Sequence, residues 1–567
     1  MLIGIDLGTT FSAAARLSEN GTAVIIPNRE GDRLTPSVVA FQGGKTLVGK
    51  AAVEYGLDKP LNTIACIKRR MGDAKFEFLT DDDDPVVYKP EQISAAILKR
   101  IAADCEAYTG EKVTGVVITV PAYFNDRRRM ATRQAGEIAG LNVLSMINEP
   151  TAAALAYGVM QQDRTETVMV FDLGGGTFDV TIEHITPGEI RVIASGGDCD
   201  LGGVLFDNAL LRYAHDAFEQ QYHFRVEDDE EAEQALRMNC EALKRRLSTQ
   251  DAGDLMIRAR GRGMMLHITR QMFEEMIEGI VHRAMIRVDR VLSDANMTAA
   301  QLDRILLVGG STRIPYIREQ LAAHLRHEIC ADIVNPDEAV ALGAAYYAQM
   351  LVSGNALAEA SAMQRETQAA PETPEEPAAP TPVMEEREER EERPADDRRL
   401  GLDGGKEPER RWGMQGNVVC EEVVIPDFTD VTAHGYGVKA YDFSTGQYEN
   451  YIMIPRNTPL PVSRTQVFCT TENGQTSINV EVTEGNETDL KYVTIIGTME
   501  ASFERSYPRD VPIQVTLSVN TEGVLEVSAF DPGRGIHLND ARIERRSSLR
   551  ESEVEEMKQQ MSGSILL

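Results

Sequence analysis

The chain has 567 residues, with 89 acidic and 58 basic side chains and a formal net charge of −31. This length exceeds what one hydrophobic core usually supports, so we expect several domains. The negative charge argues against a nucleic-acid-binding protein, because phosphate contacts require Lys and Arg. The seven cysteines show no C-x-x-C spacing, which is typical of reduced thiols. The sequence shows neither the pattern of a secretion signal nor a run of about 18 apolar residues. We therefore expect a cytoplasmic protein that does not enter a membrane.

Up to about residue 353, strand-like and helix-like patterns alternate, which is typical of an α/β fold with mixed sheets. The clearest segments have either β-branched runs or apolar residues at helical spacing. In chain order they are a strand at 113–120, a helix at 126–141 capped by Asp126, a strand at 142–147, a helix at 150–159 with Pro150 in its first turn, two strands around a glycine turn at 167–185, a strand at 304–310 and a helix at 314–325.

The composition then changes twice. Residues 354–413 are rich in Pro, Glu and Ala and poor in aromatic and β-branched residues, which predicts a disordered linker. Its EEREEREER repeat could instead form a short solvated helix. Residues 414–545 read as an all-β sandwich, and residues 546–567 contain one short helix at 548–561. The predicted strands of the sandwich are 448–454, 465–471, 476–485, 513–520 and 524–531.

Two distant segments share one unusual pattern: IGIDLGTTFSA (3–13) and VFDLGGGTFDV (170–180). In each, a strand ends in Asp-Leu-Gly and small residues follow, so backbone N–H groups are left to form an anion nest. A carboxylate beside such a nest suits a hydrated Mg²⁺ between it and phosphates. One such turn is more often just a hairpin, but two suggest a pair of lobes that bind one triphosphate. A third glycine signal, LLVGGSTRIP, ends at Pro315, and no P-loop motif occurs.

Together with VITVPAYFND (117–126), NEPTAAALAYG (148–158) and NPDEAVALGAA (335–345), these strings closely resemble the DnaK-type chaperones of the heat-shock protein 70 family. The resemblance implies a two-lobed, actin-like ATPase domain with ribonuclease-H-like lobes at 1–353, followed by a β-sandwich that binds peptides. Actin-like filaments and small-molecule kinases share the lobes, but they lack these strings and need no sandwich.

The resemblance also implies a role for individual residues. It places Lys68 at the γ-phosphate, Glu149 beside water and metal, and Asp179 near the attacking water and a monovalent cation such as K⁺. The implied catalytic set is Asp6, Lys68, Glu149, Asp172 and Thr177, with Asp6 and Asp172 holding Mg²⁺ through water. The implied ATP/ADP contacts are Thr9, Thr10, Phe11, Gly174, Gly175, Gly176, Asp179, Glu241, Lys244, Ser248, Gly309, Gly310, Ser311, Arg313 and Asp337.

Glu241, Lys244 and Ser248 have helical spacing and would otherwise read as a surface ion-pair face. Pro121 and Arg129 match positions that relay the nucleotide state to the sandwich. In the sandwich, the implied peptide-binding positions are Val438, Tyr441, Phe468, Thr471, Ile478 and Val480. Tyr441 and Thr471 match the pair that arches over the peptide, and both differ from the usual residues there. We therefore expect a changed peptide preference.

Four features depart from the family pattern. The long helical lid is missing, which predicts fast peptide release, and the leucine-rich linker is replaced by PDFTD (426–430). The apolar contact that the leucine-rich linker usually makes could come instead, at shifted positions, from Val423, Val424 and Ile425. The region 73–90 is shorter than usual, and Ser145 replaces a basic residue that receives J-domains. LGGVLFD (201–207) lacks the acidic residues that usually follow its two glycines.

These observations favour an ATP-hydrolysing chaperone that binds extended apolar segments of unfolded polypeptides. Its J-domain co-chaperone and nucleotide-exchange factor would be dedicated or absent. The alternative is a regulatory or scaffold protein that uses ATP as a switch and binds one dedicated partner. We expect neither nucleic acid nor a membrane as a partner.

Overall fold

The computed structural model describes residues 1–81, 85–161, 164–329, 334–368, 425–521, 523–542, 549–563 and 565–566. Residues 1–352 and 423–567 make up one compact unit, and residues 353–422 make up a second. None of the helices in the described part of the chain combines the length and the apolar character that a membrane crossing requires.

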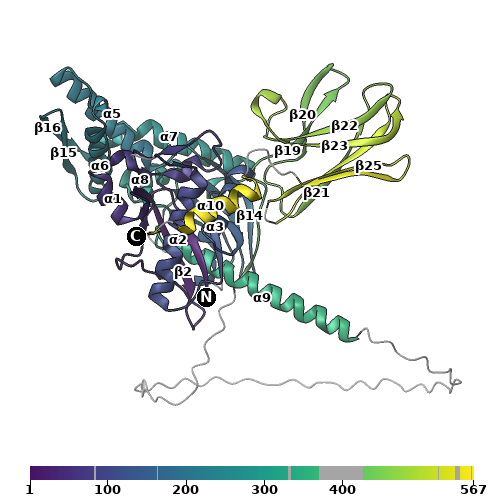
Figure 1. The fold of residues 1–567 in the computed structure, drawn as a ribbon, viewed down its shortest axis with the longest axis horizontal. Coiled ribbons are helices and arrows are strands. Elements are labelled where there is room, and N and C mark those ends of the chain that lie inside the picture. The colour runs from purple at the N-terminus through teal and green to yellow at the C-terminus, as the bar shows by residue number, and fades with distance from the viewer. Residues whose placement is uncertain are drawn as a thin grey trace, which may run out of the picture. The chain divides into compact units, whose positions relative to one another are not determined.

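The first lobe is built around a mixed six-stranded sheet in which β1 (Leu2–Asp6) is paired with a parallel and an antiparallel neighbour (Figure 1). Helices α2 (Pro90–Thr109) and α3 (Asp126–Ile138) pack with these strands around a core that contains Ile3, Ile97 and Ile118. The other strands of the sheet are β2 (Phe11–Leu17), β3 (Ala23–Ile26), β4 (Thr35–Pro36), β10 (Gly115–Val120) and β11 (Val143–Asn148).

A smaller subdomain extends this lobe. Its elements are β5 (Val38–Gln42), β6 (Lys45–Val48), α1 (Lys50–Gly56), η1 (Pro60–Asn62), β7 (Thr63–Ala65), η2 (Ile67–Arg70), β8 (Phe78–Leu79) and β9 (Val87–Tyr88).

The second lobe is built around a five-stranded sheet with the order β17-β12-β13-β14-β18. Its strands are β12 (Glu166–Leu173), β13 (Phe178–Ile185), β14 (Glu189–Asp198), β17 (Arg304–Val308) and β18 (Asp427–Thr429). Figure 1 shows its helices gathered beside the hairpin of β15 (Ala252–Ala259) and β16 (Arg262–Thr269). They are α5 (Gly203–Tyr222), η3 (Val226–Asp228), α6 (Glu230–Leu247), α7 (Arg270–Asp294), η4 (Ala299–Gln301), η5 (Gly310–Arg313) and α8 (Pro315–Leu325).

Two helices join the lobes: α4 (Glu149–Met160) and α9 (Ala339–Gln368). Both contribute to a core that also receives residues from β2 and β12. The backbones approach so closely that a Cβ added to Gly343 would lie 1.7 Å from the carbonyl oxygen of Ala152. Glycine is therefore required where α9 crosses α4.

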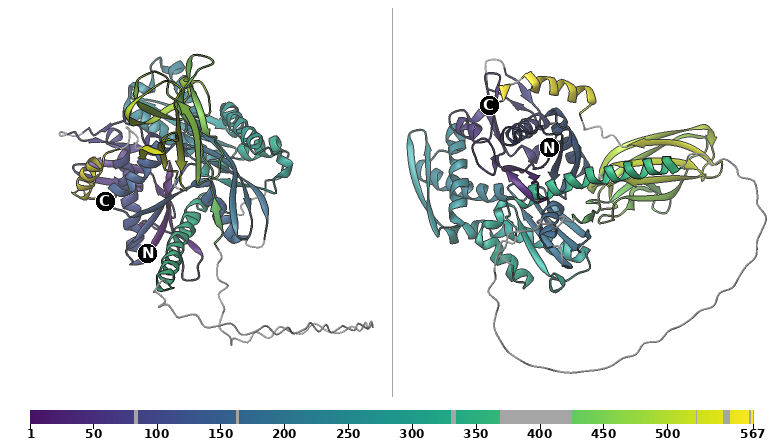
Figure 2. Two further views of the ribbon diagram at one scale, coloured as in Figure 1. Left: turned by 90° about the vertical axis from the view of Figure 1, so that its right-hand side faces the viewer. Right: turned by 90° about the horizontal axis from the view of Figure 1, so that it is seen from below.

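The sandwich consists of two four-stranded antiparallel sheets (Figure 2, green to yellow). One sheet has the order β20-β19-β22-β23 and the other β21-β24-β25-β26. Their bounds are β19 (Tyr436–Asp442), β20 (Gln447–Ile454), β21 (Val462–Cys469), β22 (Gln475–Glu484), η6 (Leu490–Tyr492), β23 (Thr494–Tyr507), β24 (Pro512–Val519), β25 (Leu525–Asp531) and β26 (Ile536–Arg542).

The two ends of the sandwich segment contact the ATPase-like lobes. At the start, β18 pairs with β14 in parallel. At the end, α10 (Glu551–Gly563) packs on α3 and α2, where Met561 is buried, and β27 (Ile565–Leu566) pairs with β6 (Figure 2). The Gln134 side-chain amide donates a hydrogen bond of 2.7 Å to the carbonyl oxygen of Leu549 and so fixes the start of α10.

The structure corrects two details of the sequence-based expectations. Asp126 does not cap α3; the Asn125 side chain does, by accepting a hydrogen bond from the backbone N–H of Arg128, and Asp126 is the first helical residue. Residues 354–368, expected to be part of a disordered linker, are helical, because α9 continues to Gln368. The rest of that predicted linker, with its charge repeat, lies outside the described residues.

Candidate functional site

The two Asp-Leu-Gly turns lie against each other between the lobes. A Cβ added to Gly175 would lie 2.5 Å from the Thr10 side chain, and one on Gly176 would lie 2.6 Å from that of Thr9. Only glycine leaves room at such a distance. The turns that the sequence repeats are therefore two walls of one site.

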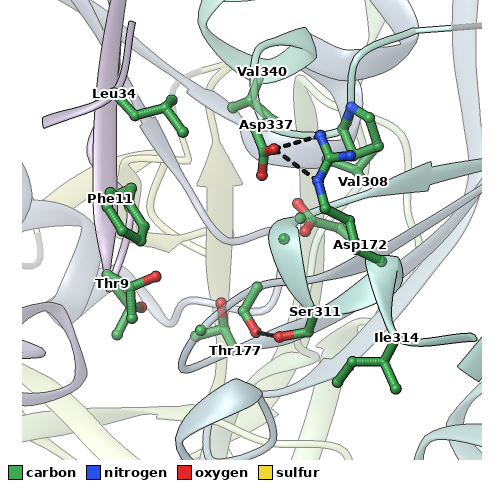
Figure 3. A pocket seen from close by; sticks show the side chains of 18 of the residues that line it. Thr9, Phe11, Leu34, Asp172, Thr177, Val308, Ser311, Ile314, Asp337 and Val340 are labelled. Atoms are coloured by element: carbon green, nitrogen blue, oxygen red, sulfur yellow. Dashed lines mark hydrogen bonds and ion pairs between the residues drawn. The ribbon is translucent and has the colours of Figure 1, made fainter. Parts of the chain in front are cut away.

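These walls enclose a cavity of about 460 Å³ (Figure 3). Its lining includes all five predicted catalytic residues. It also includes most of the predicted nucleotide contacts, namely Thr9, Thr10, Phe11, Gly174, Gly175, Glu241, Lys244, Ser248, Gly309, Gly310, Ser311, Arg313 and Asp337. Of the predicted set, Gly176 and Asp179 do not line it. Gly176 faces Thr9, and Asp179 lies behind the wall, 1% exposed, where its side chain accepts a hydrogen bond from the backbone N–H of Tyr123 at 2.9 Å.

At the floor of the cavity, a lysine is surrounded by carboxylates. Lys68 belongs to the short helix η2, and it donates a hydrogen bond to Glu149 at the start of α4. Asp6 ends β1, and Asp172 pairs with Asp179 across β12 and β13. All five side chains are buried or nearly so. Four carboxylates therefore share one ammonium group.

Burial, and after it repulsion among these acids, raises the pKa values of Asp6, Asp172 and Asp179. The pKa of Asp6 rises from 3.8 to about 7, first through desolvation and then through repulsion from Glu149, while Lys68 and the Thr119 hydroxyl oppose the rise. Desolvation and Glu149 likewise raise the pKa of Asp179 to about 7, and the pKa of Asp172 is well above its ordinary value. Burial opposes the charge of Lys68, but its carboxylate neighbours prevail and raise its pKa.

The donor set fits Mg²⁺, a hard cation that prefers carboxylate oxygens and retains much of its water. Asp6 and Asp172 are the residues that would hold it. Among the described residues, no three His, Cys, Asp or Glu side chains converge closely enough to hold a metal directly.

The far end of the cavity combines an ion pair with apolar walls. Arg313 and Asp337 form a two-point ion pair, with Nη2 to Oδ2 at 2.6 Å and Nε to Oδ2 at 2.9 Å (Figure 3). Leu34 and Val340 also line this end, Val340 beside Asp337 and Leu34 across from the ion pair (Figure 3). Sequence reasoning missed both apolar residues: Leu34 stands in no motif, and Val340 lies within NPDEAVALGAA without having been singled out.

Helix α6 supplies the remaining wall through its predicted face. The Lys244 ammonium donates to Asp207 at 2.8 Å and to the carbonyl oxygen of Gly203 at 3.2 Å. The glycine pair in LGGVLFD is required here, because a Cβ on Gly202 would lie 2.7 Å from the backbone nitrogen of Gly176. Arg245, also missed, lies over the Phe11 ring at 5.4 Å.

A second cavity, of about 1,230 Å³, lies in the sandwich. It is lined by all six predicted groove residues, with Val438 and Val480 buried in its floor. Its rim is aromatic: Tyr441 makes edge-on contacts with Phe443 and Tyr448, each at 5.3 Å between ring centroids. The strand β19, which carries Tyr441, and the turn that carries Phe443 lay outside the predicted strands, whereas β20 was predicted as a strand at 448–454.

The segment at 425–430 connects the two sites. Phe428 packs edge-on against Tyr347 of α9 at 4.9 Å, and Ile425 packs against the same core. Asp430 accepts a hydrogen bond from the side chain of Asn148, the residue directly before Glu149. Arg129, a predicted relay position, donates a hydrogen bond to the same asparagine. Val423 and Val424 lie outside the described residues.

Comparison with known proteins gives the family. The sequence model described as Hsp70 protein matches residues 2–362 and 413–564. Chaperone protein DnaK of Thermotoga petrophila is 36% identical over 565 residues, which cover 98% of this chain and 82% of the relative. The DnaK of Thermotoga neapolitana is 37% identical over 543 residues, or 94% of this chain and 79% of the relative. The chain therefore belongs to the Hsp70 family and is a chaperone-type ATP hydrolase.

Proposed function

We propose that this Hsp70-family ATPase captures extended apolar segments of unfolded polypeptides in the sandwich groove and couples their capture and release to ATP hydrolysis. The observation that carries the proposal is the continuous contact from Asp430 through Asn148 to Glu149 and Lys68. A change in the interlobe site thus has a short physical route to the start of the sandwich.

In the nucleotide site, the chain's own groups bind and orient. The backbone N–H groups of the two turns and the hydroxyls of Thr9, Thr10 and Thr177 bind phosphates, and Lys68 stabilises negative charge as it shifts during transfer. Mg²⁺ bound near Asp6 and Asp172 would supply charge neutralisation for the triphosphate. Asp179 would act on the attacking water and hold a K⁺ ion only from behind the cavity wall, where its carboxylate accepts the backbone N–H of Tyr123. The adenosine lies between the α6 face and the Arg313–Asp337 ion pair.

In the groove, backbone hydrogen bonds supply affinity and side-chain pockets supply selectivity. The aromatic rim offers ring edges and faces to the bound segment, so aromatic side chains gain contacts that aliphatic ones lack. We therefore propose a preference shifted away from leucine-centred segments. A peptide array tests this, and an ordinary leucine-centred pattern would refute it.

A reducing, cytoplasmic location and dedicated co-chaperones complete the proposal. The five cysteines among the described residues are free thiols, as expected in such a compartment. Ser145, which replaces a basic residue expected to receive J-domains, is 2% exposed. We expect that a generic J-domain protein does not raise ATP turnover by this chain.

The decisive experiment is single-turnover ATP hydrolysis with and without an unfolded polypeptide. Stimulation by several unrelated unfolded chains supports the chaperone. The alternative function is an ATP-switched scaffold for one dedicated partner, and the aromatic rim of the groove, which would suit one particular binding segment, favours it. Indifference to every unfolded chain, together with stimulation by a single folded partner, would establish the scaffold and refute the chaperone.

A further inference from the structure

The strand β13 contains a buried carboxylate that the ATPase site does not use. Glu183 is 0% exposed, and neither of its carboxylate oxygens makes a hydrogen bond of normal geometry with a described residue. Its neighbours across the sheet are Val168 on β12 and Val192 on β14, both apolar. A buried carboxylate without partners is costly, and a protein that retains one tends to keep it neutral.

Docking of the segment 425–430 brings a second carboxylate toward Glu183. In the register of β14 and β18, Arg191 lies beside Thr429, so the next residue, Asp430, follows next to Val192. Val192 itself lies beside Glu183. Asp430, the first residue after β18, and Glu183 on β13 therefore lie at the same level of the sheet, on either side of Val192 of β14.

The charged surroundings of the two acids are unequal. Asp430 accepts hydrogen bonds from Asn148 and from the backbone N–H of Val431, and the positive charge of Arg129 opposes the rise that burial causes in its pKa. Facing Glu183, the described elements offer the apolar residues of β12 and β14 and the Thr151 hydroxyl of α4. Burial, and after it the charge of Asp430, raises the pKa of Glu183 well above 4.5, and the hydroxyl only partly opposes this.

We propose that Glu183 and Asp430 form a carboxylate pair that holds one proton while the segment 425–430 lies on β14, so that Glu183 sets how strongly this segment docks. The proton is taken up from solvent by Glu183 on docking and returned on release. Glu183 is thus a positioning residue that acts through the docked segment and not on the nucleotide.

The direction of the effect follows from linkage. When the segment leaves, the charge of Asp430 leaves too, and the pKa of Glu183 falls. Docking is then strongest at a pH below the undocked pKa of Glu183. Between the undocked and the docked pKa of Glu183, the equilibrium constant for docking falls as pH rises. For one proton, the fall is at most about tenfold per pH unit. A neutral side chain at position 183 removes this dependence.

The test uses the full chain without nucleotide or peptide. Hydrogen–deuterium exchange of the backbone amides at 425–430 is measured upward from about pH 4.5, the ordinary pKa of a glutamate, over the range in which the chain stays folded, and is corrected for intrinsic exchange. Wild type should lose protection as pH rises. Glu183→Gln should stay protected and flat across the range. The control Glu189→Gln should keep the wild-type slope, because Glu189 lies opposite Asp427 in the same register but is exposed to water.

A second variant keeps the proposal testable if Glu183→Gln does not fold. Asp430→Asn removes the other charge and should also flatten the pH profile. A wild-type slope in either folded variant would overturn the proposal. The protonation of Glu183 and its effect on docking do not depend on the proposed chaperone function. Only the consequence, that docking couples the sandwich to the ATPase domain, rests on that function. Peptide-stimulated ATP hydrolysis is measured in parallel, and its absence in wild type would refute the chaperone proposal while leaving the docking result intact.

Discussion

Replacing Lys68 by Met tests the nucleotide site at its most constrained point. The lysine is 4% exposed, contacts Glu149, and is the ammonium group among the four carboxylates at the cavity floor. Methionine keeps much of the volume of the stem but removes the charge. We expect ATP to bind, because the two turns and α6 remain, and hydrolysis to fail.

The expected loss of hydrolysis rate follows from the role of a fixed positive charge in a buried site that excludes water. Removing one preorganised group that stabilises developing negative charge costs roughly 100- to 1,000-fold in rate, or about 3–4 kcal/mol. The variant also leaves Glu149 buried without its partner, which destabilises the fold by several kcal/mol, on the order of 3–5. Lys68→Met combined with Glu149→Gln relieves that penalty and should be more stable than the single variant, yet equally inactive.

The assay is single-turnover hydrolysis under saturating enzyme, with nucleotide affinity measured by calorimetry and folding by thermal denaturation. Lys50→Met serves as the matched control, because Lys50 is an exposed lysine of the same lobe. Hydrolysis by a folded Lys68→Met variant within about threefold of wild type would refute the role given to this lysine, since a lost transition-state contact costs far more.

Four further outcomes follow from the structure. In the absence of nucleotide, the free energy of unfolding of wild type should fall more than that of Asp6→Asn as pH rises from about 4 to about 7. The reason is that the pKa of Asp6 is about 7 in the folded protein and 3.8 ordinarily, so ionising this buried acid destabilises the fold. Parallel stability profiles of the two proteins against pH would contradict this. Phe428→Ala removes a half-buried ring that packs against Tyr347 and should weaken docking of the segment 425–430 by about 1–2 kcal/mol. We expect peptide to stop stimulating ATP hydrolysis while the basal rate stays unchanged. Retained stimulation in the ATPase assay would exclude this coupling route. Tyr441→Ala should weaken aromatic-rich peptides about fivefold on an array and leave leucine-rich ones unaffected, whereas a uniform loss would point to a general structural role. Gly175→Ala forces a shift against Thr10 and should weaken ATP binding at least tenfold by calorimetry; unchanged affinity would show that the turn can widen freely.

The sequence predicts those parts of the site that depend on local chemistry. The glycine turns, the strand-ending aspartates and the face of α6 are short-range patterns, and the structure brings them together as expected. Leu34 was not predicted, because it reaches the cavity from a loop with no motif of its own. Val340 and Arg245 stand in or beside recognised segments, but their residue types gave no reason to single them out. Likewise, Glu183 stands in an ordinary alternating strand, and only the tertiary neighbours make its environment apolar.

In the sandwich, strands with clear alternation were predicted, and β23 was not. Its 14 residues include Gly497 and several outward-facing charges, which weaken the apolar pattern. The docking of α10 on α3 was also missed. Met561 fits any amphipathic helix, and no local rule tells which distant surface will bury it.

The meeting of the two phosphate turns also determines when the site can first exist. Its walls are separated by roughly 165 residues, and β1 is held in place by α9: a Cβ on Gly4 would lie 2.2 Å from the backbone nitrogen of Ala345. A nascent chain therefore cannot assemble the nucleotide site until nearly the whole ATPase domain has been synthesised. Because ligand binding stabilises only the state that binds it, ATP selectively stabilises chains in which both lobes have folded and closed on each other. The protein proposed to act on unfolded chains is thus itself subject to a folding check set by its own nucleotide.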